Sequence, residues 1–322
     1  MTRSLTLLLA LGLLAACAAG EGSNPFDDDG DGDPGNGGGG DPVAPIPESV
    51  AGDVTRVNYD PAQNTIVVEG LTLDDTPFDA VYARAPALEA NVPGYRVFTR
   101  QNDPLDRHST AFVREAANGA VRGAAVVTGG PRNRYFGGTF FERDGAYDPP
   151  DVTPTSGLVT YTGTYAGLTN VGGSREDVLP VPPGTPPELI PSQSAEVSGR
   201  IFINADFSDN SIEGNIIDRQ LVDAGIALPS IVLVRTSITD DGTFFGEEVE
   251  YQGVVDEDIG DYAGIIGGTD ASGLSGGLFL TEWDGQGDPL GFENEEEYGV
   301  FVLERCGTPG VNDPLGVCAG VN

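Results

Sequence analysis

The stretch VSGRIFINADFSDNSIEGNIID, residues 197–218, is the clearest structural signal in the chain. Apolar and polar residues alternate along it, with Ile201, Ile203 and Phe207 among those that share one face. Side chains of a β-strand point to opposite faces in turn, so this alternation predicts strands with one buried face. Residues 208–210 interrupt it with the Ser, Asp and Asn typical of turns. The sequence therefore predicts a β-hairpin, and an isolated hairpin needs further strands to be stable in water.

Strand patterns continue on both sides of this hairpin. Alternating runs bounded by turn residues predict eight strands, at 157–166, 196–207, 210–218, 230–238, 242–251, 261–267, 272–282 and 298–304. Eight antiparallel strands joined by hairpin turns can close into an up-and-down barrel, which leaves no open sheet edge. We therefore expect an eight-stranded antiparallel barrel over residues 151–305. The long connection near 167–196 holds six prolines, and long loops on barrels are commonly functional or disordered.

A second β-rich region comes earlier in the chain. Its predicted strands are 54–59, 65–70, 78–84, 95–100, 110–116, 121–128 and 134–142. A proline cluster at 149–154 separates this region from the barrel. The 47 glycines and 24 prolines of the chain suit short strands and turns better than helices. We predict an all-β protein whose first β-rich domain spans residues 48–150.

The N-terminus has the pattern of a secretory signal, which we place at residues 1–16. Arg3 supplies the positive start, and the apolar run 5–14 is too short to span a bilayer. The tetrapeptide Leu-Ala-Ala-Cys at 14–17 resembles the lipoprotein box of bacteria, in which the cysteine is acylated and becomes the first residue. We therefore predict lipidation of Cys17, which would anchor the chain stably because three acyl chains exceed the two signals needed. The alternative is an ordinary signal peptide that has a cysteine there by chance.

Residues 17–47 predict a tether rather than a folded segment, because their Gly, Asp and Pro bury too little to fold. By resemblance to lipoprotein sorting, Ala18 after the acylated cysteine favours the outer membrane. The acidic run 27–33 has the first half of a calcium-loop spacing, but Gly38 stands where that loop needs a bidentate glutamate. We interpret the run as a solvated spacer that holds the folded part away from the membrane.

The charge of the chain excludes a general nucleic-acid binder. All 16 basic residues are Arg, and 50 acidic residues bring the net charge to −34, whereas nucleic-acid binding needs a basic face. The charge is uneven, with nine Arg and five acids in residues 84–143 but three Arg and 23 acids in residues 201–305. This asymmetry indicates either a surface that faces a partner or two halves that complement each other within one molecule.

The tail, residues 306–322, carries Cys306 and Cys318. In an exported protein this pair is expected to form a disulfide, which would stabilise the fold by about 3 kcal/mol according to the loop-entropy estimate. No further Cys or His accompanies the pair, so a zinc site is not predicted.

Arg132, Arg134, Tyr135 and Phe136 form a basic and aromatic group near the end of the first β-rich domain. Arginine and aromatic residues are enriched at the hot spots of protein interfaces, so this group is a candidate for binding a protein partner. The alternative is an ordinary strand whose aromatic side chains belong to the core.

Patterns typical of enzymes are incomplete in this sequence. The G-x-S-x-G at 273–277 matches serine hydrolases, but it lies in a strand pattern and the single histidine, His108, precedes it. His108 has no second imidazole or cysteine cluster beside it and is a poor metal anchor. The acidic run 293–297 could be imagined as a glycosidase pair, but we interpret it as a solvated loop. We predict no catalytic residue, no cofactor and no metal site, and therefore a protein that is not an enzyme.

Several phrases in the barrel region resemble those of a known family. They are YTGTY at 161–165, GRIFINADF at 199–207, SIEG at 211–214, GIIGG at 264–268 and LSGGL at 274–278. The family is the transferrin-binding-protein-B-like and factor-H-binding-protein-like surface lipoproteins of Gram-negative bacteria. The resemblance implies a "handle" β-domain, a small filled barrel, a lipid anchor and a flexible leader. No residue that contacts transferrin or factor H can be mapped onto this chain.

These observations predict an outer-membrane lipoprotein that faces the cell exterior and binds a protein partner, and the resemblance adds a role in iron or nutrient acquisition. The alternative is a small-molecule carrier that uses the barrel interior as lipocalins do. Bulky inward residues such as Ile201, Ile203 and Leu233 argue against that alternative. A membrane-spanning barrel is also disfavoured, because charged residues such as Arg200 and Glu213 lie within or beside the predicted strands.

Overall fold

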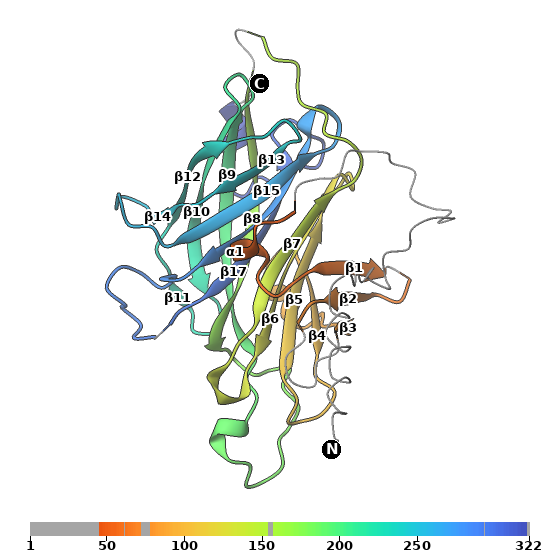
Figure 1. The fold of residues 1–322 in the computed structure, drawn as a ribbon, viewed down its shortest axis with the longest axis vertical. Helices are drawn as coiled ribbons and strands as arrows, with labels where there is room; N and C mark the ends of the chain where they lie inside the picture. Colours follow the sequence, from red (N-terminus) through yellow and green to blue (C-terminus); the bar gives the residue numbers. More distant parts are fainter. Residues whose placement is uncertain (1–44, 61, 72–77, 154–156, 293, 321–322) are drawn as a thin grey trace, which may run out of the picture. The chain divides into compact units, whose positions relative to one another are not determined.

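We describe a computed structural model of the chain over residues 45–60, 62–71, 78–153, 157–292 and 294–320. These residues form two antiparallel sheets, one of seven strands and one of ten (Figure 1). The described residues belong to one compact unit. The predicted fold class, an all-β chain with a β-rich sheet followed by an antiparallel barrel, is confirmed. The division into two domains near residue 150 remains a prediction.

The larger sheet forms a nearly closed barrel. Most neighbours in the sheet are also consecutive in the chain, and the last strand, β17, pairs with the first, β8. The strands are β8 (Leu158–Gly172), β9 (Ser194–Asp206), β10 (Ser211–Leu221), β12 (Ile231–Ser237), β13 (Thr243–Gly246), β14 (Val249–Tyr251), β15 (Gly260–Gly267), β16 (Gly273–Leu280) and β17 (Glu297–Arg305), with the short β11 (Ile226–Ala227) beside β10.

One interrupted strand closes this barrel. The half β14 pairs with β12, whereas the half β13 pairs with β15 on the other side. Two further contacts join the interrupted strand to β12 and the residue that follows it. The backbone N–H of Val234 donates to the carbonyl of Glu248 at 3.3 Å, and Ile238 forms a β-bridge with Phe244. The two halves together correspond to the single strand predicted at 242–251. All eight predicted barrel strands are therefore present.

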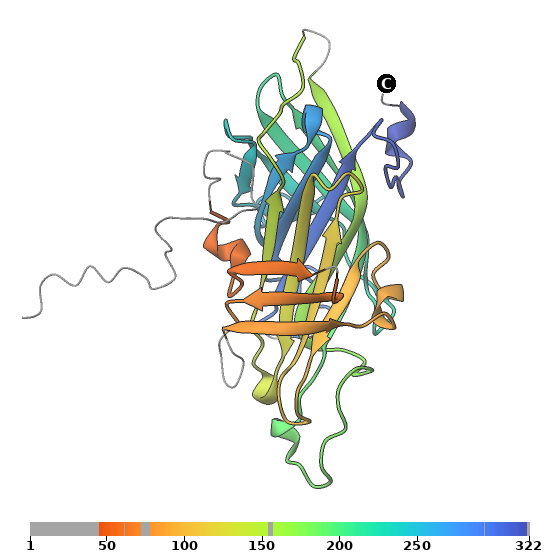
Figure 2. The ribbon, with the colours of Figure 1, turned by 90° about the vertical axis from the view of Figure 1, so that its right-hand side faces the viewer.

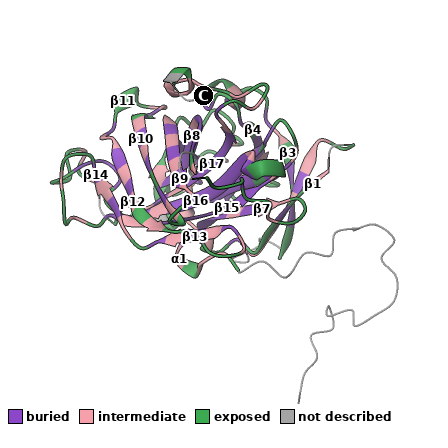
Figure 3. Ribbon diagram, turned by 90° about the horizontal axis from the view of Figure 1, so that it is seen from above, coloured by how far each residue is buried: buried purple, intermediate pink, exposed green. Residues whose placement is uncertain are grey.

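Side chains fill the interior of the barrel. The predicted inward residues Ile201, Ile203 and Phe207 are buried, and the opposite face of the hairpin is half-buried. The same alternation of buried and half-buried residues is visible along β10 and β12 in Figure 3. Large side chains complete the core, because Trp283, Arg219, Tyr161, Tyr165, Tyr262 and Phe301 are each less than 2% exposed. An eight-stranded barrel is just wide enough to be filled in this way.

Gly299 shows how closely these large side chains pack. A Cβ atom at this position would collide with the hydroxyl and the ring of Tyr165. Only glycine therefore leaves room for the tyrosine to cross from β8 toward β17 inside the barrel.

The smaller sheet is a meander of seven strands in chain order. They are β1 (Arg56–Asp60), β2 (Thr65–Glu69), β3 (Asp79–Arg84), β4 (Arg96–Arg100), β5 (His108–Glu115), β6 (Val121–Gly129) and β7 (Gly137–Arg143). β3 pairs with β4 through only two residue pairs, and Figure 2 shows β1–β3 running across the direction of β5–β7. All seven strands predicted for this region are present.

Helices are short in the described residues. They comprise one α-helical turn, α1 (Glu48–Ala51), and the 3₁₀ turns η1 (Leu88–Ala90), η2 (Pro131–Asn133), η3 (Pro187–Leu189), η4 (Thr269–Ala271) and η5 (Val317–Gly320). None of the helices in the described ranges has the length and apolar character needed to cross a membrane.

The two sheets pack against each other through apolar and charged side chains. Val121 of β6 packs with Val302 of β17 in one buried cluster. Beside it, Arg114 of β5 donates to Glu304 of β17 at 3.0 Å, and both side chains are buried. The arginine-rich first region thus neutralises part of the acidic second region within one molecule. This pair supports the second of the two interpretations of the charge asymmetry.

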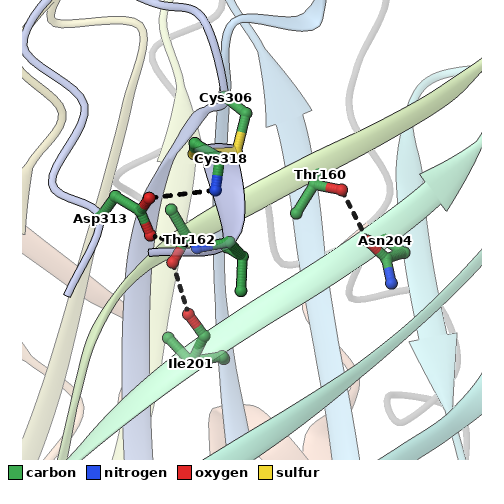
Figure 4. Close-up of a disulfide and its surroundings, with 8 residues drawn as sticks. Thr160, Thr162, Ile201, Asn204, Cys306, Asp313 and Cys318 are labelled. Carbon is green, nitrogen blue, oxygen red and sulfur yellow. Dashed lines mark hydrogen bonds between the residues drawn. A yellow bond between two sulfur atoms is a disulfide. The ribbon is translucent and has the colours of Figure 1, made fainter. Parts of the chain in front are cut away.

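The predicted disulfide between Cys306 and Cys318 is formed, with the two Cα atoms 5.2 Å apart (Figure 4). The carboxylate of Asp313 accepts hydrogen bonds from the backbone N–H groups of Val317 and Cys318, at 3.0 Å each. The guanidinium of Arg200 in β9 donates to the carbonyl of Pro314 at 3.0 Å. The tail is therefore fixed to the outside of the barrel.

Candidate partner-binding hollow and acidic loop

The four residues predicted to bind a partner lie together in the connection between β6 and β7. Arg132 and Arg134 are exposed, and Arg132 adopts a left-handed backbone conformation with φ of 60°. Tyr135 and Phe136 are half-buried. The structure thus brings the group together, with its charges outside and its rings partly inside.

The two aromatic side chains also have contacts within the fold. The Tyr135 hydroxyl lies 3.0 Å from the hydroxyl of Ser192, and burial raises the pKa of this tyrosine. The guanidinium of Arg107 lies 4.8 Å from the centre of the Phe136 ring, which is a cation–π arrangement. The alternative interpretation of these aromatic residues as part of the core is therefore correct in part.

A hollow of about 630 Å³ lies beside this group. Three segments line it: the β6–β7 connection, the end of β8, and the loop of residues 281–296 between β16 and β17. Its lining includes Arg134, Tyr135, Phe136, Asn170, Phe292 and Glu296. Such a mixture of arginine, aromatic, amide and carboxylate groups suits the recognition of a protein surface.

Asn170 ties the 281–296 loop to β8. Its backbone N–H donates to the carbonyl of Glu296 at 3.0 Å, and its side-chain oxygen accepts from the N–H of Glu296 at 3.1 Å. Its side-chain nitrogen donates to the carbonyl of Asn294 at 2.5 Å. One asparagine thus holds the C-terminal end of the loop against the barrel.

The same loop holds a cluster of three carboxylates, Asp284, Asp288 and Glu295. One oxygen from each lies within 4.8 Å of the others. Asp284 is 2% exposed and Glu295 is 7% exposed, whereas Asp288 is exposed to solvent. Burial and the negative charges of the neighbouring acids, Asp284 first among them, raise the pKa of Glu295. We call this group the acidic cluster.

A second buried carboxylate site lies inside the barrel beside this loop. Arg219 donates to Glu297 at 2.6 Å, and both side chains are fully buried. Tyr165 donates to the other oxygen of Glu297, and Arg219 also donates to the carbonyl of Trp283 at 3.1 Å. Burial, followed by the charge of Glu297, raises the pKa of Tyr165. We call Arg219, Glu297 and Tyr165 the paired cluster.

The interpretation of residues 293–297 as a solvated loop is wrong for two of its glutamates. Glu295 and Glu297 are buried, and Glu296 is half-buried, whereas residue 293 lies outside the described residues. The cause is that β17 begins at Glu297, so the run enters the barrel with alternate residues pointing inward. The sequence carries no signal of this alternation, because residues 295–297 are all glutamate.

Two other residues considered in the sequence, Ser275 and His108, are held by contacts within the fold. Ser275 lies within β16, and its hydroxyl donates to the carbonyl of Arg122 at 3.0 Å, so the G-x-S-x-G stretch is a strand rather than a nucleophile elbow. His108 is buried at the start of β5, with its Nε2 atom 3.0 Å from the carboxylate of Asp177. Cys17 and the acidic run 27–33 lie outside the described residues.

Comparison with known proteins yields similarities of structure alone. No protein-family model matches the chain, and no curated protein matches it. Among solved structures, it is similar to a double mutant of transferrin-binding protein B from Haemophilus parasuis Hp5, with 12% identity and a TM-score of 0.40 over 78% of this chain and 42% of that one. Intact Ap-TbpB, with its N and C lobes, gives 12% identity and a TM-score of 0.36 over 78% and 43% of the two chains.

The isotype 1 transferrin-binding protein B of serogroup B Neisseria meningitidis gives 15% identity and a TM-score of 0.32 over 77% of this chain and 40% of that one. The chain therefore spans less than half the length of these three structures. At such identities the likeness concerns the fold alone. These structures are transferrin-binding proteins B, which belong to the family that the sequence phrases resemble.

Proposed function

We propose that this chain is a lipid-anchored binding protein of the outer-membrane surface, attached through Cys17, that recognises a protein partner. The observation that carries the proposal is the filled barrel interior. Trp283, Tyr165 and Phe301 occupy the space that a carrier would need for its ligand. The outer surface and the loops are then the places where a partner can bind, which argues against the lipocalin-like alternative.

The hollow beside Tyr135 is the best candidate for the partner's binding site. It combines exposed arginine with half-buried aromatic side chains from separate segments of the chain. Such anchors, surrounded by polar groups, are typical of interface hot spots. Iron or nutrient acquisition is the role that the family resemblance implies for this interaction, and we propose no catalytic function.

The anchor and the surface location are tested on intact cells. Externally added protease is expected to degrade the wild-type chain while the outer membrane is whole. The Cys17→Ser variant should lose its acyl chains and leave the membrane fraction. Full protection of the wild-type chain until the outer membrane is broken would contradict the surface location.

The binding site is tested with a photo-crosslinking amino acid placed at Arg134 of the full-length chain. Placing the same amino acid at the exposed Arg235 of β12 provides the matched control. We expect one cell-surface or medium protein to be crosslinked from position 134 and not from position 235. An additional Arg132→Glu substitution should weaken that crosslink. Equal crosslinking from both positions would contradict the hollow as the binding site.

A further inference from the structure

We propose that Asp284, Asp288 and Glu295 form a calcium-binding site in the loop between β16 and β17. The starting point is the spacing of their oxygens. Two oxygens that each lie about 2.4 Å from one calcium ion are at most about 4.8 Å apart. The three carboxylates meet this limit, since one oxygen from each lies within 4.8 Å of the others.

A second observation concerns hydrogen bonds that are missing. Asp284 Oδ1 and Glu295 Oε1 are buried and accept no hydrogen bond from a donor group of the described residues. A buried carboxylate oxygen without a partner is costly, because burial removes the water that would solvate its charge. The other oxygen of Asp284 accepts from the backbone N–H of Leu290 at 3.0 Å. This hydrogen bond holds the carboxylate in place while its second oxygen remains available for a ligand.

The charge of the cluster points to a cation as that ligand. The nearby Arg219 is engaged with Glu297 and with the carbonyls of Pro229 and Trp283. The cluster contains oxygen ligands and no sulfur or imidazole, which suits a hard cation. A bound divalent ion would give the acidic cluster a positive partner, as Arg219 does for Glu297.

The loop favours calcium over magnesium. Calcium accepts six to eight oxygens in irregular geometry, whereas magnesium requires a near-ideal octahedron. Asp288 is exposed, so waters can complete the coordination on its side. The loop also has Gly285 at φ 138° and Gly287 at φ 81°, conformations that let its backbone turn closely around an ion. Calcium sites of extracellular proteins commonly have dissociation constants of about 0.1–1 mM.

Calcium binding would also affect the hollow, a consequence that rests on the proposed function. The same loop supplies Phe292 and Glu296 to the lining. An ion that joins Asp284 to Glu295 connects the start of the loop with its end. The wall of the hollow would then be more rigid when the ion is bound.

The test is thermal unfolding of the full-length protein, purified in detergent, stripped with EDTA and measured with CaCl₂, MgCl₂ or NaCl at equal ionic strength. We expect 1–5 mM calcium to raise the melting temperature by several degrees, and magnesium by much less. Glu295→Gln and Asp288→Asn should each weaken calcium binding about tenfold or more, measured by calorimetric titration. The control is Glu115→Gln, which makes the same change at an exposed glutamate of β5 and should keep the wild-type response.

Asp288→Asn keeps the test decisive if Glu295→Gln impairs folding, because Asp288 is exposed. Equal shifts in wild type and Asp288→Asn, or no shift at 10 mM calcium, would overturn the site. Equal responses to calcium and magnesium would overturn the choice of calcium. These measurements need no partner, so their failure is distinguishable from failure of the crosslinking experiment.

Discussion

The paired cluster and the acidic cluster lie next to each other, yet their charges are arranged in opposite ways. Glu297 receives hydrogen bonds from Arg219 and Tyr165, whereas Glu295, two residues earlier, has a buried oxygen without a partner among the described residues. Both glutamates are buried, so burial does not explain the difference. In the first cluster both carboxylate oxygens of Glu297 have donors within the protein, although Arg219 Nε has no partner among the described residues. In the second cluster one oxygen each of Asp284 and Glu295 has no donor among the described residues, and calcium is proposed to fill that place.

The largest expected effect is that of breaking the paired cluster. Arg219→Ala would leave the buried Glu297 without its ionic partner, and we expect the free energy of unfolding to fall by about 3–5 kcal/mol. Urea denaturation would measure it, with Arg122→Ala as a control at an exposed pair with Glu142. If the two substitutions cost the same, the stabilising role assigned to the paired cluster is wrong.

The disulfide provides a test outside both clusters. Replacing Cys306 and Cys318 by Ser opens a loop with a sequence separation of 12 and should lower the free energy of unfolding by about 3 kcal/mol. Guanidinium denaturation of the oxidised wild type and the double variant would show it. The calcium response should stay unchanged, and its loss would mean that the tail contributes to the acidic loop.

Another buried carboxylate, that of Glu196, extends the comparison to the pH dependence of stability. Burial raises the pKa of Glu196 from 4.5 to about 7, and one of its oxygens has no partner among the described residues. The folded state then binds this proton more tightly than the unfolded state does. Stability therefore falls as the pH rises from about 4.5 to 7, by on the order of 2 kcal/mol.

Glu196→Gln should remove that loss while the side-chain oxygen can still accept from Asn91. Urea denaturation at pH 5 and pH 8 would compare the two proteins. An unchanged pH dependence in the variant would show that other groups cause it.

The smallest effect is expected at an ion pair on the surface. Arg200 and Asp218 form a pair in which both side chains are more than 40% exposed. Solvent screens such pairs, so Asp218→Asn, which leaves the hydrogen bond from Arg200 to the tail in place, should change the free energy of unfolding by less than about 1 kcal/mol. Thermal unfolding would measure it. A loss as large as that of Arg219→Ala would mean that burial does not control the strength of these pairs.

Several strands of the barrel could be predicted because they have one buried face and one more exposed face. The predicted strand 210–218, for example, is observed as Ser211–Leu221, and buried residues alternate with more exposed ones along most of it. β8 was predicted too short, ending at 166 rather than Gly172. Its residues from Tyr165 to Thr169 are all buried, because the barrel core covers one face and the β6 strand the other. Alternation is lost where both faces are covered.

The paired cluster and the acidic cluster could not be predicted in the same way. Glu297 is neutralised by Arg219, 78 residues away in the chain, so no local pattern distinguishes it from a solvated glutamate. Asp284 and Glu295 come together only because the loop folds back on itself. The disulfide could be predicted from the sequence, because Cys306 and Cys318 are close in the chain and such a pair oxidises in an exported protein. The sequence did not show which carboxylates are left without a partner.

The pairing of β17 with β8 means that the barrel is a ring in which the first and last strands are neighbours. Its connectivity then does not depend on where the polypeptide starts. A circularly permuted barrel, with new ends in the exposed turn at Ser208–Asn210 and a linker from β17 to β8, would keep every strand pair of the larger sheet. The pairing of strands in the folded barrel therefore does not require the order in which these strands are synthesised.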